Sequence, residues 1–185
     1  MSTLAPPITY DQFIRTPETN LHVEVEDGRM IVRDMPGGSH QRAIGRLVGV
    51  LDAAAPPGFE AVPSPYDWII RREDPLRVRQ PDVLVLPSQL VEAGRLHVPP
   101  LLAVEILSDS SVRRDTVTKP REYAAAGLDH YWTVDVRSAR QAWIAVHRRE
   151  GDHFVEVDRA VGAAALHVAE PFAVALRPVD LTTRR

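Results

Sequence analysis

A single acidic residue, Glu105, lies within the otherwise apolar run Leu101–Leu107. A buried and unpaired carboxylate would cost several kcal/mol, or its pKa would shift until the group became neutral. Chains keep such a group when it is paired with a cation or when it binds a metal. A structural ion pair with an arginine, a solvent-facing position at a strand end and a metal-binding role all remain open for Glu105.

A second carboxylate, Asp82, opens another apolar run directly after Pro81. The segment PDVLVL over residues 81–86 is typical of a buried strand that begins near a bend. Carboxylates on two neighbouring strands can converge on one side of a sheet, and Mg²⁺ prefers such oxygen ligands. We therefore expect the strands of Asp82 and Glu105 to be adjacent and their carboxylates to converge, although Asp82 alone also fits an ordinary cap or turn.

The chain contains one lysine, Lys119, among its 22 lysine and arginine residues. Lysine offers a compact charge on a flexible stem and a titratable amine, which arginine does not. Asp115, Lys119 and Tyr123 follow one another at intervals of four residues and would share one face of a helix. This spacing fits a chemical role for Lys119, but it equally fits a solvated helix with an ordinary Asp115–Lys119 pair, and a lone lysine can be a chance remainder.

The composition limits which kinds of site are available. With 185 residues, 44% of them hydrophobic, the chain fits one domain with a sizeable core. The absence of cysteine excludes disulfides and thiolate metal sites, so a metal would be held by carboxylates, histidines or carbonyls. The net charge of −3 argues against binding nucleic acid through a broad basic surface, but it allows a local basic face. No signal-peptide pattern or membrane-length apolar run occurs, so we expect a cytoplasmic protein that does not bind membranes.

Strands dominate the pattern and two main helices are expected to pack on the sheet, so the predicted class is α+β. Asp27-Gly28 divides an alternating stretch into an N-terminal hairpin, and a C-terminal hairpin is expected to turn near residues 150–152. Apolar residues at helical spacing predict a helix from an N-cap at Ser39 to about Ala55. The other expected elements are a short helix at 9–15, strands at 59–62, 67–71, 81–86, 101–107, 130–136 and 171–176, and a helix from 112 or 115 to 126 with Gly127 as its C-cap.

Taken in order, these pieces resemble the Uma-type family of restriction-endonuclease-like proteins, within the PD-(D/E)xK nuclease superfamily. The family pattern places an acidic hairpin before a helix that opens with His-Gln. The motifs PDV-x-V, V-E-[VI], R-R-D-x-x-x-K and Y-x-x-x-G…Y-W-x-V-D then follow. The matching segments, which fall within residues 9–137, are Glu24–Gly28, His40–Gln41, Pro81–Val85, Val104–Ser108, Arg113–Asp115 with Lys119, and Tyr123–Asp135.

The resemblance implies one restriction-endonuclease-like domain over residues 1–185. Its mixed central β-sheet would be flanked by helices, with N-terminal and C-terminal β-hairpins. It also implies a metal-dependent nuclease that hydrolyses phosphodiester bonds, with DNA as the expected substrate. Asp82, Glu105 and the backbone carbonyl of Ile106 would ligate Mg²⁺ or Mn²⁺. Glu24 would add an acid near the pocket, and His40 would lie near it at the start of the first main helix.

One position departs from the superfamily pattern. In a simple E-x-K motif the lysine stands two residues after the glutamate, where this chain has Leu107. The family resemblance places the lysine on the following helix, at Lys119, where it would orient or deprotonate the attacking water and stabilise developing charge. The residues expected to hold flanking phosphates or to line the pocket are Arg113, Arg114, Arg121 and Tyr123.

Other classes of function stay open. A catalytically silent domain of the same fold would bind nucleic acid or a partner protein, but the chain retains the two acids and the lysine that catalysis needs. A hydrolase of another type is disfavoured because no G-x-S-x-G, Walker, G-x-G-x-x-G or H-E-x-x-H motif occurs. Cutting both strands of a duplex needs two sites, so a homodimer is an expectation from function alone.

Overall fold

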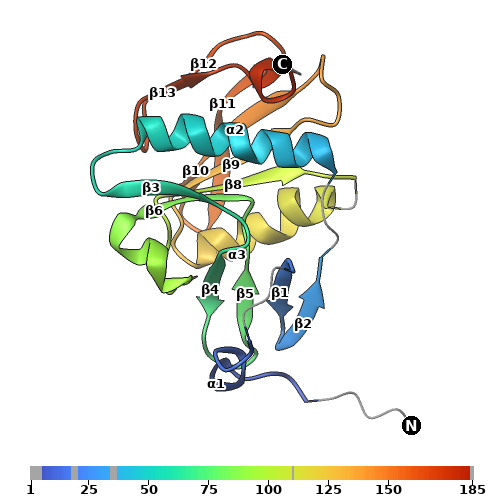
Figure 1. Ribbon diagram of the computed structural model, residues 1–185, viewed down its shortest axis with the longest axis vertical. Helices are drawn as coiled ribbons and strands as arrows, with labels where there is room; N and C mark the ends of the chain where they lie inside the picture. Colours follow the sequence, from blue (N-terminus) through green and yellow to red (C-terminus); the bar gives the residue numbers. More distant parts are fainter. Residues whose placement is uncertain (1–5, 18–20, 34–36, 110, 184–185) are drawn as a thin grey trace.

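The computed structural model describes residues 6–17, 21–33, 37–109 and 111–183. Its centre is a mixed sheet of six strands in the order β11-β10-β9-β8-β6-β3 (Figure 1). Its strands are β3 (Phe59–Pro63), β6 (Val83–Pro87), β8 (Leu102–Leu107), β9 (His130–Asp135), β10 (Trp143–Glu150) and β11 (His153–Val161). The predicted α+β class with a mixed central sheet is confirmed.

Strands β6 and β8 are direct neighbours, as the two apolar runs predict. They pair antiparallel with Val83 opposite Val104, whereas β8 and β9 pair parallel with Glu105 opposite Thr133. The first of these pairings brings the residue before β6 next to the last residues of β8. Asp82 therefore lies beside the end of the strand that carries Glu105 and Ile106.

Two helices cover opposite faces of the central sheet (Figure 1). Helix α2 (Gly38–Ala54) packs Leu47 and other apolar residues into one core with Trp132. Helix α3 (Lys119–Ala125) contributes Tyr123 to a second core with Tyr131. Because neighbouring residues of a strand point to opposite faces, the consecutive rings of Tyr131 and Trp132 serve the two cores separately. Both are buried core residues, as the alternation in their strand predicts.

A second mixed sheet of five strands, in the order β2-β1-β5-β4-β7, closes the other end of the molecule. The N-terminal hairpin that Asp27-Gly28 predicts forms its β1–β2 edge, whereas the short strands β5, β7 and β12 were not predicted. The remaining elements are β1 (Val23–Glu26), β2 (Arg29–Val32), β4 (Asp67–Arg71), β5 (Arg77–Arg79), β7 (Arg95–Leu96), β12 (Leu166–Val168), β13 (Val174–Leu176), α1 (Tyr10–Phe13), η1 (Ser88–Ala93) and η3 (Pro178–Leu181).

Two local predictions about the helices are corrected. Helix α2 begins at Gly38 with Gly37 as its N-cap, so Ser39 lies inside the first turn and is not the cap. The helix predicted to reach residue 126 is divided by a π-helical segment, η2 (Arg114–Thr118), in which the Lys119 N–H bonds the Arg114 carbonyl five residues earlier. Pro120 gives the reason, because a proline at this point of a regular α-helix would clash with the preceding turn. Of the helices in the described part of the chain, none combines the length and apolar character that crossing a bilayer requires.

We expect Gly28→Ala to lower the free energy of unfolding by about 2–4 kcal/mol. Gly28 has a φ of +73°, and an added Cβ would lie 2.4 Å from the Pro7 Cβ. A left-handed conformation and an overpacked contact each cost about 1–3 kcal/mol. Equilibrium urea denaturation measures the change, with Gly94→Ala as the matched control, since Gly94 has a φ of +68° but no atom within 4 Å of an added Cβ. Equal losses in the two variants would contradict the Pro7 contact.

Candidate active site

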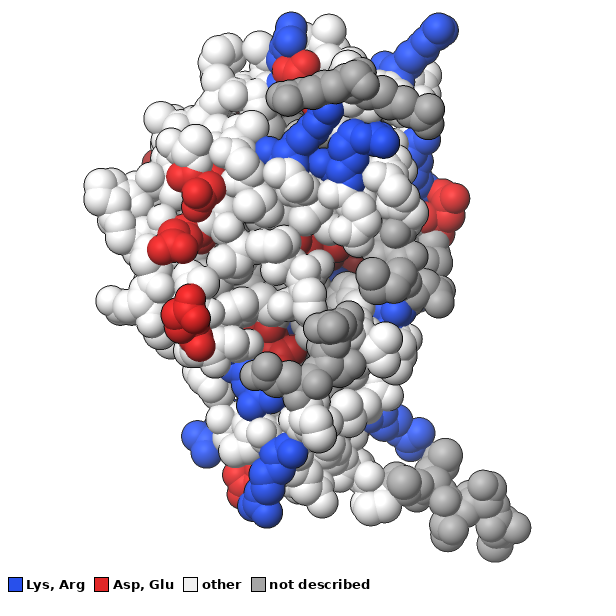
Figure 2. Space-filling view, in the orientation of Figure 1, with Lys and Arg blue, Asp and Glu red and all other residues white. Residues whose placement is uncertain are grey.

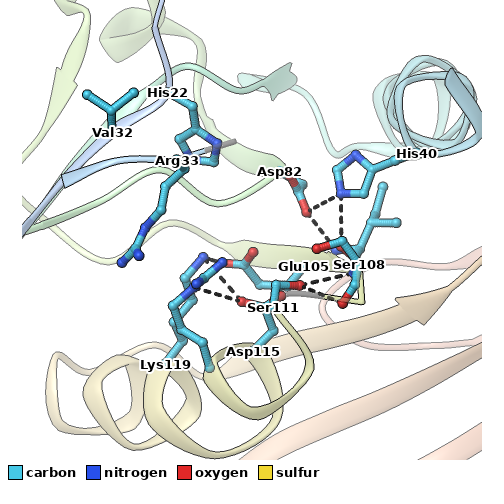
Figure 3. Close-up of a pocket in the computed structure, with 12 residues that line it drawn as sticks. His22, Val32, Arg33, His40, Asp82, Glu105, Ser108, Ser111, Asp115 and Lys119 are labelled. Carbon is cyan, nitrogen blue, oxygen red and sulfur yellow. Dashed lines mark hydrogen bonds and ion pairs between the residues drawn. The ribbon is translucent and has the colours of Figure 1, made fainter. Parts of the chain in front are cut away.

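A pocket of about 140 Å³ opens where β1, β2, α2, β8 and η2 meet (Figure 3). Most of its walls are polar, and it collects residues from segments far apart in the sequence. The lining residues are His22, Val32, Arg33, His40, Asp82, Glu105, Ile106, Ser108, Ser111, Arg114, Asp115 and Lys119. Asp82 and Glu105 line the same pocket, so the predicted convergence of the two carboxylates is confirmed.

Asp82 and Ile106 form one side of the pocket together with His40. The Asp82 Oδ2 accepts a hydrogen bond of 2.7 Å from the Ile106 backbone N–H. The His40 Nε2 lies 2.9 Å from the Ile106 carbonyl oxygen and 3.2 Å from Asp82 Oδ2. Burial acts to lower the pKa of His40, but the hydrogen bond to Asp82 and the charge of that carboxylate outweigh it, so the pKa is raised. His40 therefore contacts both of these predicted ligand groups, and its contact with Asp82 favours the protonated imidazole.

Glu105 is buried at the floor of the pocket, with 2% of its surface exposed. Its Oε1 accepts hydrogen bonds from Lys119 Nζ at 2.8 Å and from the Tyr123 hydroxyl at 2.6 Å. Burial raises the pKa of Glu105 to about 8, and the nearby charges of Asp115 and Asp82 act in the same direction against the lowering effect of Lys119. Surroundings that keep a proton on a buried carboxyl near neutral pH also favour a metal cation bound there instead of the proton.

Lys119 is buried among three carboxylates. Its Nζ lies 2.8 Å from Glu105 Oε1, 3.1 Å from Glu24 Oε1 and 3.5 Å from Asp115 Oδ1. Burial alone would lower the pKa of Lys119, but the charges of Glu105, Glu24 and Asp115 outweigh it and raise the pKa. The raised pKa favours the protonated ammonium, and the sequence-based idea that Lys119 deprotonates water stays a prediction. The alternative of a solvated helix face is wrong, because 2% of the lysine is exposed.

Glu24 lies behind Lys119 and does not line the pocket. Its Oε2 accepts hydrogen bonds from Arg33 Nε at 2.8 Å and from Arg79 Nη1 at 3.0 Å. Burial acts to raise the pKa of Glu24, but Lys119, Arg79 and Arg33 together hold it well below its usual range. Glu24 is therefore favoured in its ionised form, contacts Lys119 and is not one of the lining residues of the pocket.

The other residues predicted from sequence are distributed unevenly. Arg114 lines the pocket, and Tyr123 is buried beneath it with its hydroxyl on Glu105. Arg113 is exposed and is not one of the lining residues, and Arg121 lines a different hollow. Among the residues that sequence reasoning missed are Arg33 and His22, which line the pocket, and Arg79, which supports it through Glu24.

The donor atoms of the pocket fit a hard cation in type. Asp82, Glu105 and Asp115 present carboxylates to it, and the buried Asp115 Oδ1 has no hydrogen bond in the described structure. Among the described residues, no three His, Asp or Glu side chains are already arranged as a ligand set. His40 contacts Asp82 through Oδ2 alone, so Asp82 Oδ1 and the second lone pair of the Ile106 carbonyl are the acceptors that a cation could use beside the imidazole.

Comparison with known proteins gives the family and the fold of the chain. The family model Uma2, described as "Putative restriction endonuclease", matches residues 10–181. A crystal structure of a "putative nuclease belonging to DUF820" from Anabaena variabilis superposes with a TM-score of 0.74 at 21% sequence identity, covering 95% of this chain and 98% of that one. A search of curated proteins found no match. The solved structure establishes the fold, and the family model, which spans most of the chain, establishes that this protein belongs to the Uma2 family.

Proposed function

We propose that the protein is a metal-dependent nuclease that hydrolyses phosphodiester bonds in DNA. The observation that carries this proposal is the burial of the lone lysine among Glu24, Glu105 and Asp115, beside an open pocket that also holds Asp82. Burying one cation together with several carboxylates lowers the free energy of unfolding, and purely structural sites rarely keep such an arrangement. The family description supports the same class of reaction.

The residues of the pocket divide the work of the reaction. Asp82, Glu105 and the Ile106 carbonyl would hold Mg²⁺ or Mn²⁺, which when bound supplies a Lewis acid and lowers the pKa of water. Lys119 acts as a fixed positive charge that stabilises negative charge developing on the phosphate. Glu24 and Tyr123 are positioning residues, because each contacts Lys119 or Glu105 from behind. Arg114 and Arg33 lie in the pocket wall, where they can contact the phosphates on either side of the cut.

The direct test is a cleavage assay on single-stranded and double-stranded DNA with Mg²⁺, Mn²⁺ or EDTA. We expect cleavage with either metal, none in EDTA, and a loss of at least a hundredfold in Asp82→Asn. RNA of the same sequence tests the choice of substrate. Cleavage that persists in EDTA would contradict metal dependence, and binding of DNA without cleavage under every condition would favour the catalytically silent alternative.

Metal affinity should rise with pH until about pH 8 and then level off. A metal binds the ionised form of Glu105, whose pKa is raised to about 8, so protons compete with the metal below that pH. Below the pKa, one competing proton changes the apparent affinity by about tenfold per pH unit. Calorimetric titration with Mn²⁺ from pH 6 to 9 measures the slope, and Glu105→Gln is the control that should bind weakly at every pH. A native affinity that does not change with pH would show that Glu105 is not a ligand.

A further inference from the structure

A second and larger hollow, of about 570 Å³, lies on the other side of the π-helical segment η2. Asp115 of η2 lines the candidate active site, whereas Thr116 and Val117 line this second hollow. Its floor is the part of the central sheet formed by β9, β10 and β11. The lining residues are Thr116, Val117, Pro120, Arg121, Tyr131, Thr133, Trp143, His147, His153, Phe154, Glu156 and Arg159.

Aromatic rings cover much of this floor. The ring of Tyr131 lies 5.7 Å from that of His147 and 5.4 Å from that of Phe154, measured between centroids. At the far end, the guanidinium carbon of Arg159 lies 4.3 Å from the centroid of the Trp143 ring. Flat rings and guanidinium planes are the groups on which unpaired nucleobases stack.

One edge of the Arg159 guanidinium is hydrogen-bonded to a neighbouring carboxylate. Its Nε and Nη2 donate to the two carboxylate oxygens of Glu156, at 2.8 Å and 2.6 Å. The forked pair fixes the plane of the guanidinium against Trp143 and leaves it 40% exposed. Trp143 and Arg159 together therefore form a stacking platform whose guanidinium is already oriented by Glu156.

The hollow also carries an unused positive charge at its rim. The side chain of Arg121 is exposed, and it makes no hydrogen bond or ion pair with any other residue in the described part of the chain. Glu156 pairs with Arg159, so Arg121 is the lining arginine whose charge has no ion-pair partner in the described part of the chain. One positive charge beside a stacking platform is complementary to a nucleotide, which joins a flat base to a singly charged phosphodiester.

We propose that this second hollow binds an unpaired nucleobase of a single-stranded nucleic acid, with the base on the Trp143–Arg159 platform and a flanking phosphate on Arg121. The inference rests on the proposed nuclease function, because η2 lines both this hollow and the candidate active site, so a strand bound here would lie close to the proposed cut. The hollow would thereby select substrates with unpaired bases near the cut. A fully paired duplex keeps its bases stacked inside the helix and therefore has no unpaired base that could bind in the hollow.

Tryptophan fluorescence tests the proposal directly. The chain has three tryptophans. Trp68 and Trp132 are 1% and 0% exposed, whereas Trp143 is partly exposed in the hollow. We expect a short oligothymidylate, titrated in EDTA, to quench the native protein's fluorescence. Arg121→Gln should weaken binding about tenfold, and Trp143→Leu should weaken it by at least fivefold when binding is followed by the anisotropy of a labelled oligonucleotide.

Matched controls separate stacking from general attraction to phosphate. Arg15→Gln removes another exposed arginine, two residues after α1 and outside the hollow, and should leave the affinity unchanged. An oligonucleotide of the same length with abasic sites keeps the phosphates but lacks bases, and a duplex keeps its bases paired. Both should bind more weakly and cause no quenching. Arg121 is a surface residue, so its variant tests the hollow even if Trp143→Leu fails to fold.

Each outcome decides the proposal. Quenching that requires bases, together with the specific loss in Arg121→Gln, supports it. Equal binding of the abasic strand, equal losses in Arg15→Gln and Arg121→Gln, or no quenching would overturn it. Because the titration contains no metal, its result is independent of cleavage. A protein that never cleaves but shows base-dependent quenching would contradict the proposed nuclease function and leave the binding site standing.

Discussion

Lys119→Met should lower the free energy of unfolding by about 3–5 kcal/mol and reduce cleavage by a factor of at least about 10². The ammonium of Lys119 is the shared partner of Glu24, Glu105 and Asp115, and methionine fills much of the same volume without the charge. Removing the ammonium leaves the buried carboxylates without their shared cation, so that they repel one another. Chemical denaturation in EDTA at pH 8 measures the loss of stability, and the cleavage assay measures the loss of rate.

A second change separates the charge effect from packing. Adding Glu105→Gln to Lys119→Met removes one of the stranded carboxylates and should recover part of the stability but none of the activity. Lys119→Arg keeps the positive charge, but the larger, planar guanidinium does not match a buried position built around an ammonium and should itself cost about 1–3 kcal/mol. A Lys119→Met protein as stable as the native one at pH 8 would show that the carboxylates do not depend on this cation.

The double variant Asp82→Asn, Glu105→Gln should abolish both cleavage and the stabilisation of the folded protein by Mg²⁺ or Mn²⁺. A metal at about one hundred times its Kd stabilises the native state by roughly 2.7 kcal/mol, and this gain disappears when the ligands are lost. Thermal unfolding with and without metal measures it. The charge-matched control changes two exposed carboxylates instead, Glu150→Gln with Asp180→Asn, and should keep the full metal response.

The same double variant should be more stable than the native protein when both are free of metal at pH 8. The pKa of Glu105 is raised to about 8 in the folded state, above its ordinary value of 4.5. Below pH 4.5 the carboxyl is neutral in both states, and the cost of ionising it in the folded state grows as the pH rises to about 8. Glutamine avoids that cost. A metal response that survives in the double variant would place the ions elsewhere.

The main strands and helices could be predicted because their signals are local. The apolar runs around Asp82 and Glu105 required adjacent buried strands, and the spacing of Asp115, Lys119 and Tyr123 required one helical face. Pro120 was visible in the sequence but was not used to predict the π-helical segment. The short strands β5 and β7 gave too few residues for a periodic pattern.

The contacts that hold Lys119 could not be predicted in the same way. Arg79 reaches Glu24 from a strand 55 residues later in the chain, and nothing in the spacing distinguishes it from the other arginines. The buried position of Glu24 follows from the pairing of β1 with β5, which is a tertiary contact. The sequence therefore indicated that Asp82, Glu105 and Lys119 could meet, whereas the fold places Lys119 among three carboxylates.

The presence of one lysine among 21 arginines has a practical consequence. Protein made with nitrogen-15 lysine carries a single labelled side-chain ammonium, and that ammonium lies between Glu24, Glu105 and Asp115. Its proton–nitrogen signal reports on the centre of the pocket without overlap from any other side-chain amine. Slow exchange of its protons with water would reflect the burial of this group. The composition thus provides a built-in spectroscopic reporter at the position where the proposed chemistry takes place.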